Sequence, residues 1–491
     1  MVDTTPSSPF TGTVLPQGPP FWIVDGVAYD FSAWADTHPG GTIWFETTQG
    51  RDISALFHTY HRDPARLRRI LAKYRIDGPT EADVLPKMGV PPFLMPPEFD
   101  ASKDLPRLEY AEQGSLLAAI RARLDIHLSR PAVRRHDRAF DVVTGIIGAA
   151  HVAAFALLVL GAIPAWLFVV AVVLTRTALA GAGHYHIHRR SKPGRRRYAM
   201  PFGKALFDVN YVGTCLIGTD GHVLLHHPYL GSGADVKRTF FDGMLRLHPL
   251  LRVPGYTLHK FGILVLGLAV RGYEVIAREH GRSTYRLEFW LVRALLLAEL
   301  AVCLATGHVV AWIVQFVLTL WFNTFLVVAS HDFEDAEDDE LAAIPAALRN
   351  DWAAQQVCLS YDLSVVGNRW MDLFLTAGLS PHRVHHVLPY QRSGFANLAS
   401  ERAVQEACEE AGVAWERPRN LLTDRFPAIM KHYLLAPAQR VGAPPGRPPA
   451  SRVPPVSEPQ PDAGSQQRTG PVRELTEFGR FCFDGWRGVG V

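Results

Sequence analysis

Apolar and polar residues alternate in blocks along the chain, and two apolar blocks are long enough to cross a lipid bilayer. Residues 139 to about 182 are almost wholly apolar, which is too long for one span of ~20 residues and suits two. The uncharged segment 161–164 provides the turn between them. A second apolar pair covers 289–306 and 309–330, with Gly307-His308 at its turn. The pattern predicts two membrane hairpins, and hence about four transmembrane helices.

Basic residues flank the first hairpin on both sides. They are Arg134, Arg135 and Arg138 before it, and Arg189, Arg190, Arg195, Arg196 and Arg197 after it. Because basic loops stay in the cytoplasm, both ends of the hairpin are expected there. Arg176 is costly at membrane depth, so we expect the second helix to leave the bilayer near it and to continue to His188. Either Arg293 and Glu299 form an ion pair or the second apolar pair begins irregularly. Segment 256–277, which contains charges, is expected on the membrane interface.

The N-terminal part has a different pattern. Alternating apolar residues over 21–29 are interrupted by Asp25-Gly26, which predicts a short hairpin. A His38-Pro-Gly-Gly41 turn and a helical stretch that contains His58 and His61 follow. A further helix is expected over 116–128. The Pro-rich stretch from about 436 to 470 has the composition of a disordered segment.

Composition limits the class of protein. The chain has 491 residues, which predicts two or three domains, and its net charge of +3 gives no sign of nucleic-acid binding. The five cysteines are scattered, which fits a reducing compartment. The first residues lack a basic stretch followed by an apolar one, so we expect no secretory signal.

Histidines carry the candidate chemistry. They form three boxes after the apolar hairpins, H-x-x-x-H, H-x-x-x-H-H and H-x-x-H-H. The eight residues are His184, His188, His222, His226, His227, His382, His385 and His386. Residues three and four apart share a helix face, and neutral imidazole binds iron, zinc, copper and nickel. Eight rings are enough for two metal ions, and His331, directly after an apolar block, is a candidate ninth ligand.

Residues 20–78 resemble cytochrome b5, through the hairpin and the His38-Pro-Gly-Gly41 turn. This resemblance implies a small α+β domain that binds haem b between two histidines. His38 matches one axial ligand. Aligning Gly50 and Phe57 with the family pattern puts the other ligand at His61, with His58 as the alternative. Two axial histidines leave the haem iron no open position, so such a domain carries electrons.

Residues 139–430 resemble the membrane fatty acid desaturases, in particular front-end lipid desaturases with an N-terminal cytochrome b5 domain. The resemblance rests on the three boxes, their order, and the run from Trp370 to Pro389. The chain departs from the front-end pattern at His382, where many members have Gln, and at Leu388, where they have an aromatic residue. The family implies two non-haem irons, O2 as co-substrate and a fatty acyl lipid substrate. Since no dinucleotide fingerprint follows a strand, it also implies a separate NAD(P)H-dependent reductase, of the cytochrome b5 reductase or ferredoxin type.

The predicted protein is therefore multidomain: a haem domain followed by an all-α integral membrane desaturase domain, multi-pass, with both metal sites facing the cytoplasm. The expected boundaries are 1–16 for a flexible tail, 17–78 for the haem domain, 79–138 for a connector along the membrane surface, 139–433 for the desaturase domain, 434–470 for a disordered linker and 471–491 for a tail. Two alternatives stay open. The same metal centre could hydroxylate an acyl or sphingolipid chain, or the protein could be a non-enzymatic haem- or steroid-binding membrane protein.

Overall fold

The computed structural model describes most of the chain between residues 20 and 438. The described residues are 20–40, 43–82, 84, 108–110, 114–188, 206–212, 222–232, 235, 242–245, 247–265, 283–331 and 337–438. The predicted N-terminal tail, most of the Pro-rich stretch, the C-terminal tail and the basic residues after the first hairpin lie outside them.

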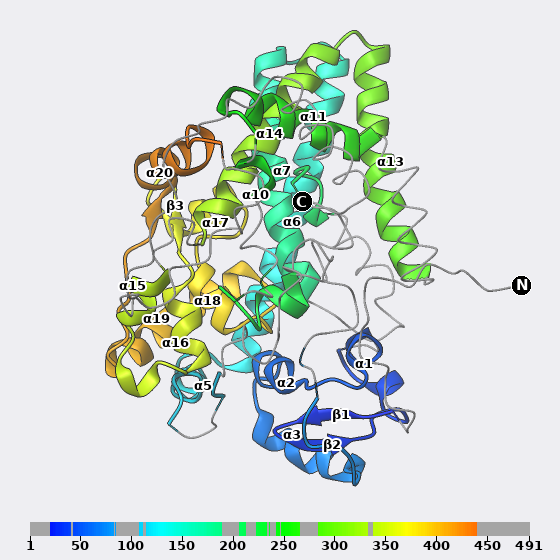
Figure 1. Ribbon diagram of the computed structural model, residues 1–491. Helices are drawn as coiled ribbons and strands as arrows, with labels where there is room; N and C mark the ends of the chain where they lie inside the picture. The colour runs from blue at the N-terminus through cyan, green and yellow to red at the C-terminus, as the bar shows by residue number, and fades with distance from the viewer. Residues whose placement is uncertain are drawn as a thin grey trace, which may run out of the picture.

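The first domain along the chain is small and lies at the lower end of the molecule (Figure 1). Strands β1 (Trp22–Val24) and β2 (Val27–Tyr29) pair antiparallel. The predicted turn joins them, with Asp25 and Gly26 both at positive φ (52° and 72°), as a two-residue hairpin turn requires. Helices α1 (Ile43–Thr48), α2 (Ser54–Tyr60) and α3 (Pro64–Leu71) complete the domain, with short 3-10 turns at Ala35–Thr37 and Ala72–Tyr74. Aromatic residues such as Trp22, Phe31, Phe45 and Phe57 form its core.

Two helical hairpins form the upper part, as the apolar pattern predicts. Helices α6 (Arg130–Val159) and α7 (Ala165–His188) turn at Gly161, and α13 (Ser283–Ala305) and α14 (Val309–Ala329) turn at Gly307. Both glycines have positive φ (68° and 78°), which other residues rarely adopt. Within the described residues, α6, α7 and α14 are long and apolar enough to cross a membrane. Helix α13 lies where the remaining span is predicted.

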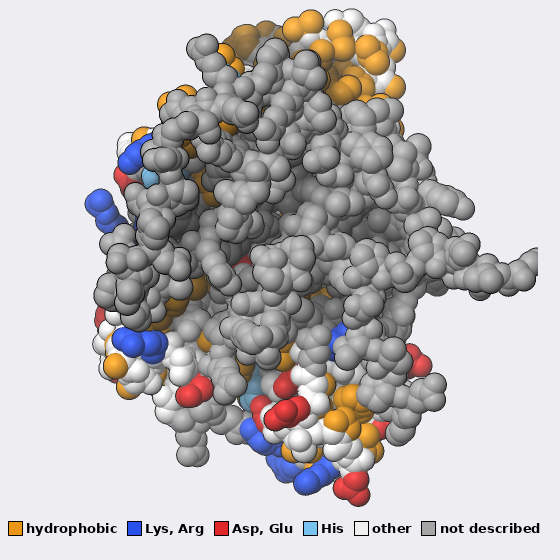
Figure 2. Space-filling view, viewed as in Figure 1, with side chains coloured by type: hydrophobic (Ala, Val, Ile, Leu, Met, Phe, Trp, Pro, Cys, Tyr) orange, Lys and Arg blue, Asp and Glu red, His pale blue; other side chains and the backbone are white. Residues whose placement is uncertain are grey.

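Apolar side chains cover the outside of this upper part. Val142, Ile146 and Val152 on α6 are each more than 60% exposed (63%, 63% and 67%). In Figure 2 the hydrophobic side chains gather at the upper end of the molecule, whereas charged side chains gather around the small domain at the lower end. Exposed apolar helices of this length are stable in lipid and not in water, so the chain is a membrane protein.

Charged residues inside the hairpins pair with other elements. Arg176 is fully buried on α7 and donates to the Glu299 carboxylate on α13 and to the Val209 carbonyl (3.0 Å). Arg293 lies 3.6 Å from Asp208. Helix α7 does run on to His188, as predicted, and Arg176 is buried between α7 and the elements packed against it. Because a charge in an apolar environment is stable only when paired, these contacts explain how Arg176 is tolerated.

Shorter helices pack around the hairpins (Figure 1). They are α5 (Leu116–His127), near the predicted 116–128, α10 (Asp242–Leu245), α11 (Pro249–Val265), α15 (Glu337–Ala342), a 3-10 turn (Ala346–Leu348), α16 (Trp352–Cys358), α17 (Arg369–Leu375), α18 (His382–Val387), α19 (Gly394–Glu410) and α20 (Phe426–Ile429). Three π-helical turns cover His222–His226, Leu421–Arg425 and Met430–Leu434, and β3 (Leu363–Ser364) pairs parallel with β4 (Arg419–Asn420). The three histidine boxes meet where α7, the first π-helical turn and α18 converge.

Candidate functional site

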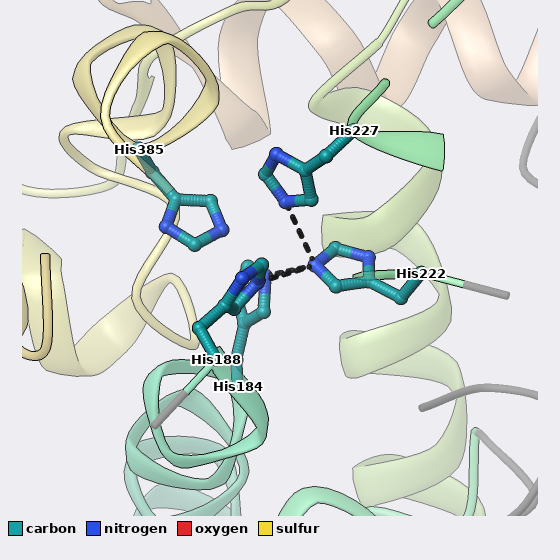
Figure 3. Close-up of side chains that lie close together, drawn as sticks. All are labelled: His184, His188, His222, His227 and His385. Carbon is teal, nitrogen blue, oxygen red and sulfur yellow. Dashed lines mark hydrogen bonds between the residues drawn. The ribbon is translucent and has the colours of Figure 1, made fainter. Parts of the chain in front are cut away.

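Five buried histidines from all three boxes form a first group (Figure 3). The Nε2 atom of His222 lies 2.8 Å from Nε2 of His184, 3.1 Å from that of His188 and 3.0 Å from that of His227. The His385 ring lies beside them, with its centroid 4.3 Å from that of His184. Imidazole nitrogens sit about 2.0–2.1 Å from a bound Zn²⁺, and two such nitrogens at right angles are roughly 3 Å apart. The observed separations match that spacing.

A second group contains His226, His331 and His386. The His226 ring centroid lies 4.6 Å from that of His331 and 5.0 Å from that of His386. His382 joins this group, because its Nε2 lies 3.2 Å from Nε2 of His386 and its ring centroid 4.7 Å from that of His331. The structure thus places His331, the candidate ninth ligand, with three members of the boxes.

Adjacent histidines separate into different groups. His227 faces the first group and His226 the second, and His385 and His386 divide in the same way. His382 was expected to share a face with both His385 and His386. It faces His386, whereas its ring centroid is 6.1 Å from that of His385. Successive residues on a helix point about 100° apart, so one short helix can supply both groups.

Buried side chains orient two rings of the second group. The Nδ1–H of His226 donates to the Asp235 carboxylate (2.8 Å), which also accepts from the backbone N–H of Gly231 (3.0 Å). The Nδ1–H of His386 donates to Oε1 of Gln356 (2.8 Å). With the proton held on Nδ1, each ring presents an unprotonated Nε2 to the group. Such partners are typical of metal-binding histidines.

Backbone carbonyls orient the other two rings. The Nδ1–H of His382 donates to the carbonyl of Ser330 (3.2 Å), and that of His331 to the carbonyl of Leu359 (3.3 Å). All four rings of the second group therefore have Nδ1 engaged and Nε2 directed to one another. This arrangement suits ligation through Nε2.

The nitrogens that face inward fit a metal better than they fit each other. Buried ring nitrogens without a hydrogen-bond partner include Nε2 of His226 and both nitrogens of His385. An unpartnered buried polar atom is costly. Burial lowers the pKa of His222, His227, His382, His385 and His386 well below its usual value, and neighbouring rings lower it further. The rings are therefore neutral, as metal ligation requires.

Two glycines let α7 approach the other elements closely enough to bring its histidines into the first group. A Cβ at Gly183 would lie 2.1 Å from the backbone nitrogen of Phe207, and one at Gly181 would lie 2.4 Å from the backbone carbon of Ala377. Any side chain at either position would push the elements apart. Gly183 directly precedes His184, so this packing fixes where that ring lies.

A separate pair of histidines lies in the small domain. The ring centroids of His38 and His61 are 6.1 Å apart, and aromatic rings, among them Phe45 and Phe57, surround them. The Nδ1–H of His61 donates to the carbonyl of Phe57 (2.8 Å), which leaves Nε2 available. Burial lowers the pKa of His61 to about 4, so the ring is neutral. This separation and the apolar surroundings fit two rings on either side of a haem iron.

His58, the alternative to His61, is engaged elsewhere. It is buried, its Nε2–H donates to the Asp25 carboxylate (2.8 Å), and its ring stacks on Tyr110 (centroids 5.5 Å apart). The geometry therefore favours His61 as the partner of His38.

Sequence reasoning missed Asp235 and Gln356. Asp235 follows the second box by eight residues and carried a weak signal, as an acidic residue near histidines. Gln356 carried no signal in the sequence, because it lies 30 residues from His386. Two asparagines, Asn368 and Asn397, lie on either side of the third histidine box in the sequence. Asn368 caps α17 by accepting from the N–H groups of Trp370 and Met371, whereas Asn397, with its amide oriented to suit both neighbours, accepts from the backbone N–H of His385 (2.9 Å).

Two known protein families match this chain, and each match contains the residues of one of the two sites. Residues 160–418, more than half of the chain, match the family described as "Fatty acid desaturase". Residues 14–77 match "Cytochrome b5-like Heme/Steroid binding domain". The first match contains all three histidine boxes and the second contains His38 and His61. Haem is thus indicated for the small domain and iron for the histidine groups.

Individual proteins similar to this chain include desaturases and a cytochrome b5-related protein. An "Acyl-lipid omega-13 desaturase" from Chlamydomonas reinhardtii is 25% identical over 85% of this chain and 94% of its own length. A "Cytochrome b5-related protein" from Drosophila melanogaster is 24% identical over 46% of this chain and 43% of its own length. A "Delta(5) fatty acid desaturase A" from Dictyostelium discoideum is 39% identical over 11% of this chain and 12% of its own length. No solved structure matches the chain. With its boxes inside a family match that covers more than half of its length, the chain belongs to the fatty acid desaturases, oxidoreductases that act on fatty acyl lipids, and carries a fused N-terminal cytochrome b5 domain.

Proposed function

We propose that the chain introduces a double bond into a fatty acyl chain, with O2 as co-substrate and electrons supplied through its own haem domain. The observation that carries the proposal is the division of nine buried or half-buried histidines into two adjacent groups, each with ring nitrogens directed inward. The division matches two metal ions rather than one. The acyl-lipid relative makes an acyl group esterified in a lipid the first substrate class to test.

Each group would hold one iron. The first would use His184, His188, His222, His227 and His385, and the second His226, His331, His382 and His386. His38 and His61 would hold the haem. When bound, the paired irons supply the oxidation of an unactivated methylene pair by O2.

The chain's own residues set the conditions for this chemistry. Neutral imidazoles do not cancel the charge of the metals, as carboxylates would, which favours an oxidising centre. Asp235 and Gln356 hold two rings in the ligating tautomer. Burial of the group excludes water, with His226, His227, His385 and His386 all 0% exposed, so the oxidising equivalents are directed to substrate rather than to solvent.

The electrons come from outside the chain in this proposal. The sequence holds no dinucleotide-binding fingerprint after a strand, so a separate NAD(P)H-dependent reductase would reduce the haem. We also propose that the chain crosses the membrane several times, with both metal sites on the cytoplasmic side. The support is the charged lower end of the molecule and the basic residues Arg134, Arg135 and Arg138 in the first turns of α6.

Product analysis tests the proposal. The full-length chain is expressed in a host of known lipid composition, and acyl products are analysed by mass spectrometry with double-bond mapping. Loss of two hydrogens supports desaturation, whereas gain of one oxygen supports the hydroxylase alternative. Replacement of His222, His226, His382 and His385 by alanine should abolish conversion.

Metal content tests the other alternative, a non-enzymatic haem protein. That alternative predicts haem iron alone, whereas the enzyme predicts about two further irons per chain. The desaturase match over 160–418 already favours the enzyme.

A further inference from the structure

The haem domain contacts the histidine groups directly through Tyr60, the last residue of α2. The hydroxyl of Tyr60 donates to the backbone carbonyl of Val223 (3.1 Å) and lies 3.3 Å from Nδ1 of His188. The Tyr60 and His188 rings are nearly parallel, at 19°, with centroids 6.0 Å apart. Figure 1 shows α2 at the boundary between the small domain and the rest of the molecule.

These contacts define where the protons lie. The single hydrogen of the Tyr60 hydroxyl is donated to the Val223 carbonyl. The hydroxyl oxygen therefore acts as the acceptor toward His188, whose Nδ1–H is the donor. A proton on Nδ1 leaves Nε2 of His188 unprotonated, and that atom lies 3.1 Å from Nε2 of His222 in the first group. Tyr60 therefore does for His188 what Asp235 does for His226, although it belongs to a different domain.

Tyr60 is also bonded to the proposed haem ligand, since it directly precedes His61. From the His61 ring to the His188 ring, the connection consists of covalent bonds and a single hydrogen bond. Trp44 packs against the Tyr60 ring (centroids 4.8 Å apart) and steadies it from the haem-domain side.

Contacts with α5 hold the haem domain in this position. Arg121 donates to the carbonyl of His61 (2.8 Å), and Arg62 pairs with Asp125 (2.5 Å). Together with the stacking of His58 on Tyr110, these contacts surround the end of α2. The haem domain is therefore docked on its own chain with Tyr60 directed at the histidine groups.

We propose that Tyr60 is a positioning residue that orients the iron ligand His188 and links it electronically to the haem, so that electrons pass within one chain. The inference rests on the proposed function. Each transfer oxidises one ferrous haem to ferric and reduces one ferric non-haem iron to ferrous, with no bond made or broken. Two transfers reduce both irons, and the external reductase restores the haem each time. Tyr60 is a neutral phenol before and after.

The variant Tyr60→Phe tests this, because it keeps the ring and removes only the hydroxyl. Tyr74→Phe is the matched control, since the Tyr74 ring packs on Phe31 and Trp34 inside the haem domain. Full-length protein with haem and oxidised non-haem iron is kept anaerobic, and the haem is reduced by a flash-generated flavin radical. The decay of the ferrous haem absorbance gives the transfer rate, and Mössbauer spectroscopy counts the ferrous non-haem iron.

The expected result is a transfer rate, a non-haem iron affinity, or both lowered by about 10–100-fold in Tyr60→Phe. The haem spectrum and midpoint potential should equal those of the wild type, and Tyr74→Phe should transfer normally. Wild-type rate and iron affinity in Tyr60→Phe would overturn the inference. Failure of the proposed function is a different result: the wild-type chain itself, loaded with both kinds of iron, would form no unsaturated product.

Discussion

Replacement of Asp235 by asparagine isolates the contribution of one orienting carboxylate to the second histidine group. Asp235 is 5% exposed and accepts from the Nδ1–H of His226 and the N–H of Gly231. Burial alone would raise the pKa of Asp235, but the adjacent His226 and the Gly231 hydrogen bond hold it below its usual value, so the group is a carboxylate. Asparagine keeps the size, removes the charge, and can turn its NH2 toward His226, which would move the ring proton to Nε2.

The magnitude follows from the bond that is lost. A hydrogen bond to a charged group contributes about 1.5–3 kcal/mol. Since 1.4 kcal/mol is a factor of ten in affinity, iron binding at the second group should weaken by roughly 10–150-fold. The first group should lose less, because the ring that Asp235 holds, His226, belongs to the second group.

Competition with a chelator measures this. Purified full-length protein is incubated with increasing chelator, and the remaining non-haem iron is determined against haem as an internal standard. Asp424→Asn is the control, because its exposed carboxylate accepts from the backbone N–H of Asn420 and the hydroxyl of Thr423. If Asp235→Asn held both irons as tightly as Asp424→Asn, the idea that Asp235 positions a metal ligand would be refuted.

Three further outcomes are expected. His61→Ala should lose most of the haem Soret absorbance during purification while His58→Ala keeps it, because only His61 faces His38; equal loss in both would contradict the assignment. Gly183→Ala should lower the free energy of unfolding by about 1–3 kcal/mol in detergent, since its Cβ would lie 2.1 Å from a backbone nitrogen, whereas Gly148→Ala, with nothing within 4 Å, should not. Asp25 should make the haem domain sensitive to acid: burial raises its pKa, but the hydrogen bond and charge of His58 outweigh this and hold it below 3.8. The stability that this carboxylate gives the folded haem domain is therefore present above pH 3.8. It is lost as the pH falls through the pKa of Asp25 in the folded state. Asp25→Asn should flatten haem release between about pH 5 and 3, and an unchanged profile would show that Asp25 has no such role.

The sequence predicted those parts of the protein that depend on local pattern. The turns at 161–164 and 307–308 could be located because an apolar block twice the thickness of a bilayer must reverse at its uncharged or glycine-containing middle. The haem-domain hairpin followed from Asp25-Gly26, which few other dipeptides replace in a two-residue turn. The histidine boxes were recognisable because ligands on one helix recur at three or four residues.

Local pattern could not supply the partners of buried charges. The sequence offered Glu299 as a partner for Arg293, its neighbour on the same helix. In the structure Glu299 pairs with Arg176 and His151 from the other hairpin. A buried charge is satisfied by whichever element packs against it, and packing between hairpins is set by the whole fold.

The sequence alone thus determined the composition of the sites: which residue type binds, in how many boxes, and beside which membrane hairpins. The tertiary structure alone decided how His226 and His227, or His385 and His386, divide between two groups, and brought Asp235, Gln356 and Tyr60 to the rings they orient. The physical reason is that helical periodicity fixes only the direction of a side chain relative to its own helix. What that side chain meets depends on close contacts such as those at Gly181 and Gly183, which join segments far apart in the chain.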